Sequence, residues 1–254
     1  MEARSGRSRA AGAPEAERSG VEGKPRMPAS DAALEALGRY AVRYVKPGQT
    51  IGLGTGHAAV AFIRALGESG IKVRGVPTSN ASAELARQYG IEIVSLAEVK
   101  QLDADFDGAD EVDPKLQLLK GFGGALVREK IVAASSKKFI VLVDPSKLFH
   151  HLGGRKRLPV EVVPFGVSYV TRAVAKLGLK GATRKDDDGS DYITDNGNPI
   201  LDCVVKDIAN PARLERELLS IPGVVGTGLF INMASIVLVA SEDGKAPRIL
   251  KPKR

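Results

Sequence analysis

The strongest constraint on the fold is a regular alternation between short, strand-like apolar runs and segments with helical periodicity. Ser30 or Asp31 can cap a first helix. Strands are then predicted at residues 50–53, 71–78, 91–96 and 138–144, with another entering "DGADE", and helices at residues 57–70, 80–90 and 123–136. Such alternation indicates an α/β fold, a mostly parallel sheet with helices on both faces. Ligands bind such sheets beyond the carboxyl ends of the strands.

From about Leu158 the order of elements changes. Strands are predicted at residues 158–165, 181–185, 191–205 and 224–231, with helices at residues 168–178 and 210–223 and a hairpin turn at Asn196-Gly197. This order, β-α-β-β-α-β, is typical of a ferredoxin-like α+β module. The strand at residues 235–240 is expected to rejoin the first sheet. We therefore predict two domains, residues 30–152 completed by 236–254, and residues 153–235.

The first 29 residues are rich in Ala, Gly, Ser, Arg, Glu and Pro and nearly lack large apolar side chains. Such a segment cannot bury enough surface to order itself, so residues 1–29 are predicted to be a disordered extension. No apolar stretch is long enough for a membrane span. Cys203 is the only cysteine, which excludes an internal disulfide and favours a reducing, cytoplasmic setting.

The net charge of +7 raises the question of a nucleic-acid partner. Much of the excess lies in the two tails, and no basic helix with interleaved aromatic residues is present. Aromatic residues make up only 5% of the chain, too few for evident base-stacking surfaces. The distribution of the positive charge and the low aromatic content therefore favour a small anionic substrate, which a basic surface attracts, over nucleic acid.

The segment "GLGTGHAA" follows a predicted strand and opens a helix. Its glycines allow a sharp turn, and the helix N-terminus after it suits a phosphate group. A P-loop is excluded because His57 follows Gly56, and a dinucleotide site is disfavoured because the second strand ends in "VPTSN" without an acid. Two interpretations stay open: a turn that holds one phosphate of a small molecule, and a strand–helix turn without a ligand. His57 is either a phosphate donor or a surface residue.

The segment "DGADEVDPKLQLLKGFGGALVREK" gathers acids, a lysine and glycines at the end of a strand. Asp107 and Asp110 are either turn formers or catalytic acids, and Lys120 precedes a glycine run. On a helical wheel Glu129 falls beside apolar residues, namely Leu126, Val132 and Ala133. Partial desolvation there would raise its pKa toward the range of a general base. Taken together, the four charged residues favour proton-transfer chemistry on a sugar.

Seven stretches resemble ribose-5-phosphate isomerase of the A type: "GLGTG", "DGADEVD", "KGFGGALVREKIV", "VDPSKL", "LPVEVVPF", "TDNGNPILD" and "IPGVVGTGLF". They occur in the family's order from about Asp31 onward. The resemblance implies a Rossmann-like domain with a ferredoxin-like domain. It also implies interconversion of ribose 5-phosphate and ribulose 5-phosphate through an enediolate, without metal or other cofactor. A homodimer or larger homo-oligomer is implied too.

By motif position, the resemblance implies a role for each charged residue. Glu129 would be the general base between C1 and C2, Asp107 and Asp110 would act in ring opening and proton transfer at the sugar oxygens, and Lys120 would stabilise charge on oxygen. Lys147 would hold phosphate. Substrate contacts are expected from Gly54, Thr55, Gly56, His57, Ala58, Lys120, Gly121, Gly123 and Lys147.

Two positions depart from the family pattern. His57 and Ala58 stand where the family usually has Ser-Thr, and Leu34 stands where it often has lysine. His57, Arg155, Lys156 or Arg157 can compensate for the lost contacts. Weaker phosphate binding would raise KM more than it lowers kcat, unless phosphate contacts also help to orient the sugar. Three alternatives remain open: a sugar-phosphate sensor without turnover, an isomerase of another phosphosugar, and a nucleic-acid binder supported by charge alone.

Overall fold

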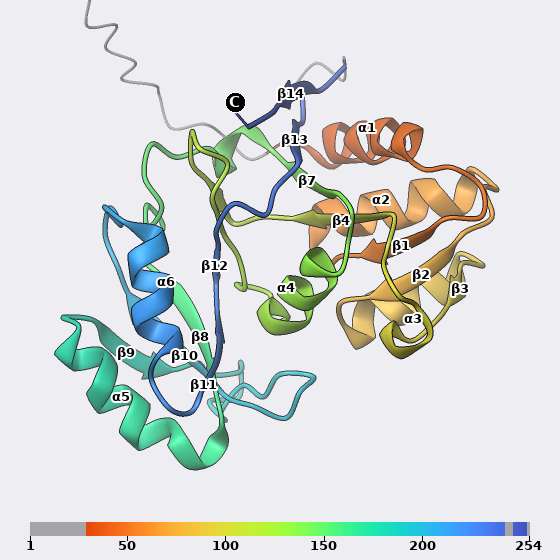
Figure 1. Ribbon diagram of the computed structural model, residues 1–254. Coiled ribbons are helices and arrows are strands. Elements are labelled where there is room, and N and C mark those ends of the chain that lie inside the picture. Colours follow the sequence, from red (N-terminus) through yellow and green to blue (C-terminus); the bar gives the residue numbers. More distant parts are fainter. Residues whose placement is uncertain (1–28, 242–245, 253–254) are drawn as a thin grey trace, which may run out of the picture.

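A computed structural model describes residues 29–241 and 246–252 (Figure 1). Apart from residue 29, the predicted disordered extension lies outside the described residues. The main sheet has seven strands in the order β14-β13-β7-β4-β1-β2-β3. Its strands are β1 (Thr50–Leu53), β2 (Arg74–Pro77), β3 (Glu92–Ile93), β4 (Ala104–Gly108), β7 (Phe139–Val143), β13 (Ile236–Val239) and β14 (Arg248–Leu250). All its pairings are parallel except that of β13 with β14, which confirms the predicted mostly parallel sheet.

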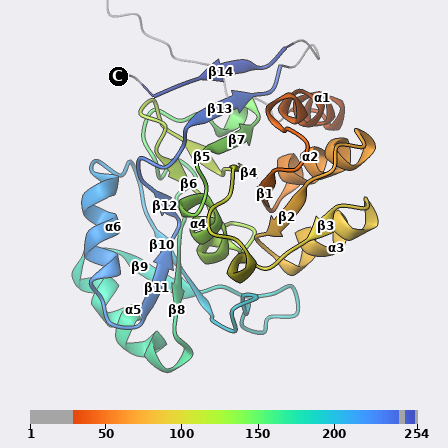
Figure 2. The same cartoon turned by 45° about the vertical axis from the view of Figure 1, so that its right-hand side comes forward.

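Helices cover both faces of this sheet (Figures 1 and 2). They are α1 (Asp31–Ala41), α2 (His57–Glu68), α3 (Asn80–Gln88) and α4 (Leu126–Ala134), with short 3-10 turns at Val42–Tyr44, Leu96–Glu98, Pro145–Lys147 and Pro164–Gly166. Leu37 of α1 and Phe62 of α2 pack on Phe106 of β4 in one apolar core. Val132 of α4 packs with Val76 in a separate cluster. Ser30 caps α1 through its side chain, as predicted.

The second sheet has four antiparallel strands in the order β11-β8-β10-β9. Its elements are β8 (Leu158–Val162), α5 (Val167–Lys176), β9 (Lys180–Thr183), β10 (Ile200–Val204), α6 (Pro211–Leu219) and β11 (Val224–Thr227). This is the strand order of a ferredoxin-like module. The predicted turn at Asn196-Gly197 is present, since the Gly197 N–H donates to the Thr194 carbonyl at 2.8 Å.

A small third sheet, which the sequence did not predict, joins the two parts. It contains β5 (Glu111–Val112), β6 (Leu118–Leu119) and β12 (Leu229–Phe230). The single strand predicted at residues 224–231 is therefore two strands, because the chain changes sheets at Gly228. A side chain there would lie 2.3 Å from the Lys120 carbonyl oxygen. The strand predicted at residues 91–96 is also shorter, since Ser95 caps the 3-10 turn that begins at Leu96.

Candidate active site

A cavity of about 500 Å³ lies at the carboxyl ends of β1, β4 and β7, which are neighbours in the main sheet. This is the edge at which parallel sheets bind ligands. Ten of the predicted site residues line it: Thr55, Gly56, His57, Ala58, Asp110, Lys120, Gly121, Gly123, Glu129 and Lys147. Asp107 and Gly54 are buried outside the lining.

Strand alternation explains how the acids of β4 reach the site. Ala104 and Phe106 face the core under α1 and α2, so Asp105 and Asp107 face the opposite side, toward α4. Two glycines of β1 leave room for these carboxylates. A side chain at Gly52 would lie 2.2 Å from an Asp105 oxygen, and one at Gly54 would lie 2.3 Å from the Asp107 carboxylate. Gly54 thus accommodates an acid of the neighbouring strand.

The centre of the site is the ammonium group of Lys120, which lies between two buried carboxylates. Its Nζ is 3.1 Å from Oδ2 of Asp107 and 3.3 Å from Oε2 of Glu129, and it donates to the Gly108 carbonyl at 2.6 Å. The three side chains are at most 5% exposed. Asp107 also accepts hydrogen bonds from the N–H groups of Thr55 and Gly108. The sequence placed Glu129 at the edge of the apolar side of its helix, and the structure buries it fully.

The two carboxylates differ in how well their charge is compensated. Burial raises the pKa of Glu129 to about 8, because Lys120 only partly offsets desolvation and the charges of Asp107 and Asp110. Burial also raises the pKa of Asp107, although Lys120 and two backbone N–H groups lower it. Burial opposes the charge on Lys120, but the surrounding carboxylates outweigh it and raise the Lys120 pKa. Glu129 is therefore a carboxyl able to exchange a proton near neutral pH.

Asp105 is a buried acid that the sequence analysis did not single out, although it shares a strand face with Asp107. It is fully buried, and neither carboxylate oxygen has a hydrogen-bond partner in the described structure. Burial and the Asp107 charge raise the pKa of Asp105 well above its ordinary range. Burial without a hydrogen-bond partner therefore favours the neutral, protonated form of Asp105 in the folded protein.

We expect Asp105→Asn to remove part of the pH dependence of stability. Above pH ~4 the unfolded chain ionises Asp105 while the folded chain keeps it protonated, so stability falls as pH rises. The free energy of unfolding of the natural protein, minus that of the variant, should fall by up to ~1.4 kcal/mol per pH unit until the folded pKa is reached. Urea unfolding at pH 5 and pH 8 measures this difference.

Asp103→Asn is the matched control for this measurement. Asp103 is paired with Lys137 at 2.9 Å, and this contact lowers its pKa. Its contribution to stability is fully present above the unfolded pKa and is lost only as pH falls below that value, so Asp103→Asn should change stability by the same amount at pH 5 and pH 8. Equal slopes for the natural protein and Asp105→Asn would contradict a protonated Asp105.

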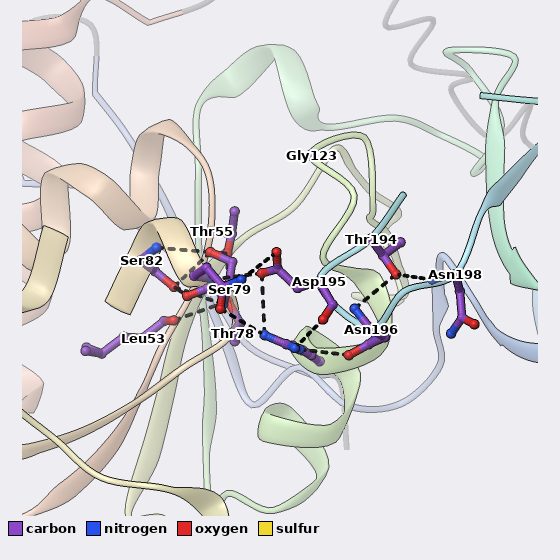
Figure 3. Close-up of polar contacts among 12 residues, drawn as sticks. Leu53, Thr55, Thr78, Ser79, Ser82, Gly123, Thr194, Asp195, Asn196 and Asn198 are labelled. Carbon is purple, nitrogen blue, oxygen red and sulfur yellow. Dashed lines mark hydrogen bonds and ion pairs between the residues drawn. The ribbon is translucent and has the colours of Figure 1, made fainter. Parts of the chain in front are cut away.

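The glycine turn after β1 lines the cavity and leads into the N-terminus of α2. Gly56 has φ of 100°, a conformation that favours glycine, and His57 begins α2. The first-turn N–H groups of a helix lack intrahelical partners and attract anions. The Thr55 hydroxyl lies 2.8 Å from the hydroxyls of both Thr78 and Ser79, which fixes the turn against the start of α3 (Figure 3). His57 is exposed at the cavity wall.

A hairpin of the second sheet also approaches the site (Figure 3). The Asp195 carboxylate accepts hydrogen bonds from the backbone N–H of Asn80 at 2.7 Å and from the side-chain amide of Asn80 at 3.0 Å. Arg128 donates to the Asp195 carbonyl at 2.6 Å and to Asn196 Oδ1 at 2.8 Å. Asn80 begins α3, and Arg128 precedes Glu129 on α4. The hairpin therefore ties together the two helices that border the glycine turn and the proposed base.

The hairpin itself is held by a buried carboxylate of β8. Oε1 of Glu161 accepts from the Thr194 hydroxyl at 3.2 Å and from the side-chain amides of Asn196 and Asn198, both at 2.9 Å. The "TDNGN" motif thus forms a turn whose polar side chains converge on one acid. This turn brings Asp195 into contact with Asn80 of α3 and Arg128 of α4.

Lys147 lines the cavity after β7, in a 3-10 turn capped by Asp144. Leu34, which stands where the family often has lysine, lines it as well. Arg155, Lys156 and Arg157 are not among the described lining residues, and Arg157 is paired with Asp202 at 2.7 Å. His57 and Lys147 are thus the side chains of the lining that can donate to a phosphate beside Lys120.

The structure covers residues 29–241 and 246–252, and none of the helices in this part of the chain has the length and apolar character needed to cross a membrane. None of its groups of His, Cys, Asp or Glu is arranged to hold a metal ion. In the acid cluster of the cavity, the Lys120 ammonium occupies the position between the carboxylates.

Comparison with known proteins shows the family to which the chain belongs. The model of ribose 5-phosphate isomerase A (phosphoriboisomerase A) matches residues 74–244. A ribose-5-phosphate isomerase A from Roseiflexus sp. (strain RS-1) is 47% identical over 210 residues, which cover 81% of this chain and 90% of that protein. One from Oceanobacillus iheyensis is 43% identical over 221 residues, 85% of this chain and 98% of that protein.

Two solved structures are similar over most of their length. Ribose 5-phosphate isomerase A from Methanocaldococcus jannaschii has a TM-score of 0.81 at 41% identity, covering 87% of this chain and all of that one. A D-ribose-5-phosphate isomerase in complex with phospho-erythronic acid has a TM-score of 0.82 at 37% identity, covering 86% of this chain and 97% of that one.

Proposed function

This chain belongs to the ribose 5-phosphate isomerase A family, and we propose that it interconverts D-ribose 5-phosphate and D-ribulose 5-phosphate through an enediolate. The observation that carries this proposal is the buried Lys120 ammonium between Asp107 and Glu129, opening on a cavity with a helix N-terminus. The site thus combines a base, a cation that can stabilise an oxyanion, and a turn that can bind an anion, within one small cavity.

The proposed chemistry is a proton transfer between neighbouring carbons. The Glu129 carboxylate takes the proton from C2 of the open-chain aldose, and the electron pair forms the C1–C2 double bond as the C1 carbonyl becomes an oxyanion. Lys120 stabilises that charge. Glu129 then gives the proton to C1, and the proton of the C2 hydroxyl is transferred to the C1 oxygen, so that C2 becomes the ketone and C1 carries the hydroxyl. Asp110, which lines the cavity, is assigned to ring opening and to proton transfer at the oxygens, with Asp107 holding Lys120.

The bound form of one relative supports this assignment. That structure contains phospho-erythronic acid, a sugar acid that carries a phosphate and a carboxylate. A carboxylate is a planar anion with two oxygens, as is the reacting end of an enediolate. A site with a phosphate turn at one end and Lys120 at the other suits such a ligand.

The test is the formation of ketose from ribose 5-phosphate, followed by absorbance, with a panel of other phosphorylated pentoses and hexoses. We expect ribose 5-phosphate to have the highest kcat/KM. Preference for a hexose phosphate would contradict the proposed substrate. Binding of ribose 5-phosphate without turnover would instead support a sensor.

The pH profile should report the Glu129 carboxyl. A general base must be ionised, so kcat/KM is expected to rise from pH 7 toward pH 9 with an apparent pKa near the value of about 8 given by burial. The second phosphate pKa is about 6, so the substrate is already a dianion across this range. A profile that is flat from pH 7 to pH 9 would contradict this role for Glu129.

Lys147→Ala should weaken binding of the substrate phosphate. Loss of a charged contact worth about 1.5–3 kcal/mol corresponds to a KM increase of about 10- to 100-fold, with a smaller change in kcat. Steady-state kinetics with ribose 5-phosphate measure this, and exposed Lys138→Ala is the matched control. Weak turnover of unphosphorylated ribose should be equal in both variants, and an unchanged KM would remove Lys147 from the phosphate site.

We also propose a homodimer or larger homo-oligomer, and two domains at residues 30–152 with 236–254 and residues 153–235. Exposed apolar side chains at one end of the small domain support association, since Phe165 is fully exposed and Tyr169 is half exposed. Light scattering at micromolar concentration tests the first proposal, and a monomeric mass would contradict it.

A further inference from the structure

The glycine loop, residues 121–124, connects Lys120 to the helix that carries Glu129. Gly121 and Gly123 line the cavity, and Gly121 and Gly124 have φ of 102° and 88°. The Phe122 N–H donates to Oδ2 of Asp110 at 3.0 Å. The position of this loop therefore sets the position of Asp110 and of the backbone next to Lys120. A loop so rich in glycine is intrinsically permissive, so it requires contacts from outside to hold one conformation.

Those contacts come from the second sheet. Arg184, which follows β9, donates from Nη1 to the carbonyls of Gly121 at 3.0 Å and Phe122 at 3.1 Å. Its Nε and Nη2 donate to the two oxygens of Asp202 on β10 at 3.0 and 2.8 Å. Arg184 is only 7% exposed. One buried guanidinium thus joins a carboxylate of the small sheet to two carbonyls of the glycine loop.

Tyr192 closes the other end of the loop. A side chain at Gly124 would lie 2.0 Å from the Tyr192 hydroxyl oxygen, and that hydroxyl donates to the Gly123 carbonyl at 3.4 Å. The Tyr192 N–H donates to the Arg184 carbonyl at 3.0 Å, so one backbone pairing places both side chains. The guanidinium of Arg184 also lies 5.5 Å from the centre of the Tyr192 ring.

We propose that Arg184 is a positioning residue for the isomerase reaction, one that holds the glycine loop so that Asp110 and Lys120 face the sugar. This inference rests on the proposed function. Arg184 is not among the described residues that line the cavity, so it acts through the loop. An arginine is required because its planar fork can bind a carboxylate bidentately and still direct an N–H at two carbonyls. A lysine at this position cannot make all four contacts.

Two variants and a control test the proposal by steady-state kinetics with ribose 5-phosphate. Arg184→Ala and Arg184→Lys should lower kcat by about 10- to 100-fold, since small misplacements of catalytic groups have effects of this size. KM should change little, because the glycine turn and Lys147 keep their places. Guanidinium ion at sub-denaturing concentration should restore part of kcat in Arg184→Ala and none in Arg184→Lys. Lys185→Ala, which removes only an exposed pair with Asp191 at 2.8 Å, should match the natural protein.

A double variant separates positioning from a general structural effect. If Arg184 acts through Asp110, then Arg184→Ala should cost less kcat in an Asp110→Asn background than alone. Asp202 keeps its pair with Arg157 at 2.7 Å, so Arg184→Ala leaves no isolated carboxylate. A kcat equal to that of the natural protein in a folded Arg184→Lys would overturn the inference. Additive effects of Arg184→Ala and Asp110→Asn on log kcat would overturn it as well. If Arg184→Ala does not fold, Arg184→Lys alone decides.

Amide hydrogen exchange keeps this inference distinct from the proposed function. Residues 121–124 should exchange faster in Arg184→Lys than in the natural protein, whether or not the protein isomerises ribose 5-phosphate. Equal exchange rates would contradict the proposal that Arg184 holds the glycine loop, but would not affect the proposed isomerase activity. Absence of turnover in the natural protein would overturn the proposed function. Faster exchange in Arg184→Lys would still support the role of Arg184 in holding the glycine loop.

Discussion

Glu129→Gln is expected to lower kcat for ribose 5-phosphate by about 10²- to 10⁴-fold, the range that a positioned general base contributes. The amide keeps the size and shape of the side chain but cannot take a proton from C2. Substrate binding should persist, because the phosphate turn and Lys147 are separate from Glu129 in the cavity. The measurement is steady-state kinetics together with calorimetric titration of the sugar phosphate.

Glu215→Gln is the matched control for that variant. Glu215 is a largely buried glutamate of α6 whose carboxylate pairs with Lys130 of α4 at 2.5 Å. It is not among the described residues that line the cavity. Its loss should cost stability but leave kcat close to that of the natural protein. Equal kcat losses in the two variants would mean that any disturbance of α4 abolishes turnover, which would contradict a specific role for Glu129.

Lys120→Met is expected to reduce both turnover and stability. Removal of a donor to a developing oxyanion lowers kcat by about 10²- to 10³-fold. Removal of one member of a buried ion pair costs about 3–5 kcal/mol, because Asp107 and Glu129 lose the cation that compensates their charge. Without it the pKa of each carboxyl rises further, so the stability difference should widen from pH 5 to pH 8.

Lys130→Met provides the comparison for this prediction. Lys130 is also largely buried and paired with a carboxylate, and it follows Glu129 on the same helix. It should lose stability without a comparable loss of kcat. Kinetics and urea unfolding at the two pH values measure both quantities. A Lys120→Met protein as active as Lys130→Met would remove the proposed oxyanion role.

Much of the site could be predicted from local sequence patterns. Strand and helix alternation predicted a site at the carboxyl ends of the strands, and the glycine turn after β1 and Asp110, which follows β4, line the cavity there. Helical periodicity placed Glu129 beside Val132, and both residues are buried. These features depend on residues close in sequence, which is why periodicity reveals them.

What could not be predicted depends on contacts between distant segments. The third sheet pairs Leu119 with Leu229 through strands of two residues, too short to show a period. Arg184 meets carbonyls 62 and 63 residues earlier, and no spacing rule connects them. Asp105 could have been found by strand alternation from Asp107. Its burial without a partner required knowledge of Gly52 on the neighbouring strand.

In the proposed reaction one buried carboxylate moves a proton between adjacent sugar carbons, and solvent deuterium incorporation tests this transfer most directly. Ribose 5-phosphate is incubated in D₂O with the natural protein or Glu129→Gln, and carbon-bound deuterium at C1 and C2 is followed by NMR. We expect incorporation at these two carbons with the natural protein, and with Glu129→Gln a rate lower by the same factor as kcat. Exchange at the natural rate in a folded Glu129→Gln would show that another group removes the proton.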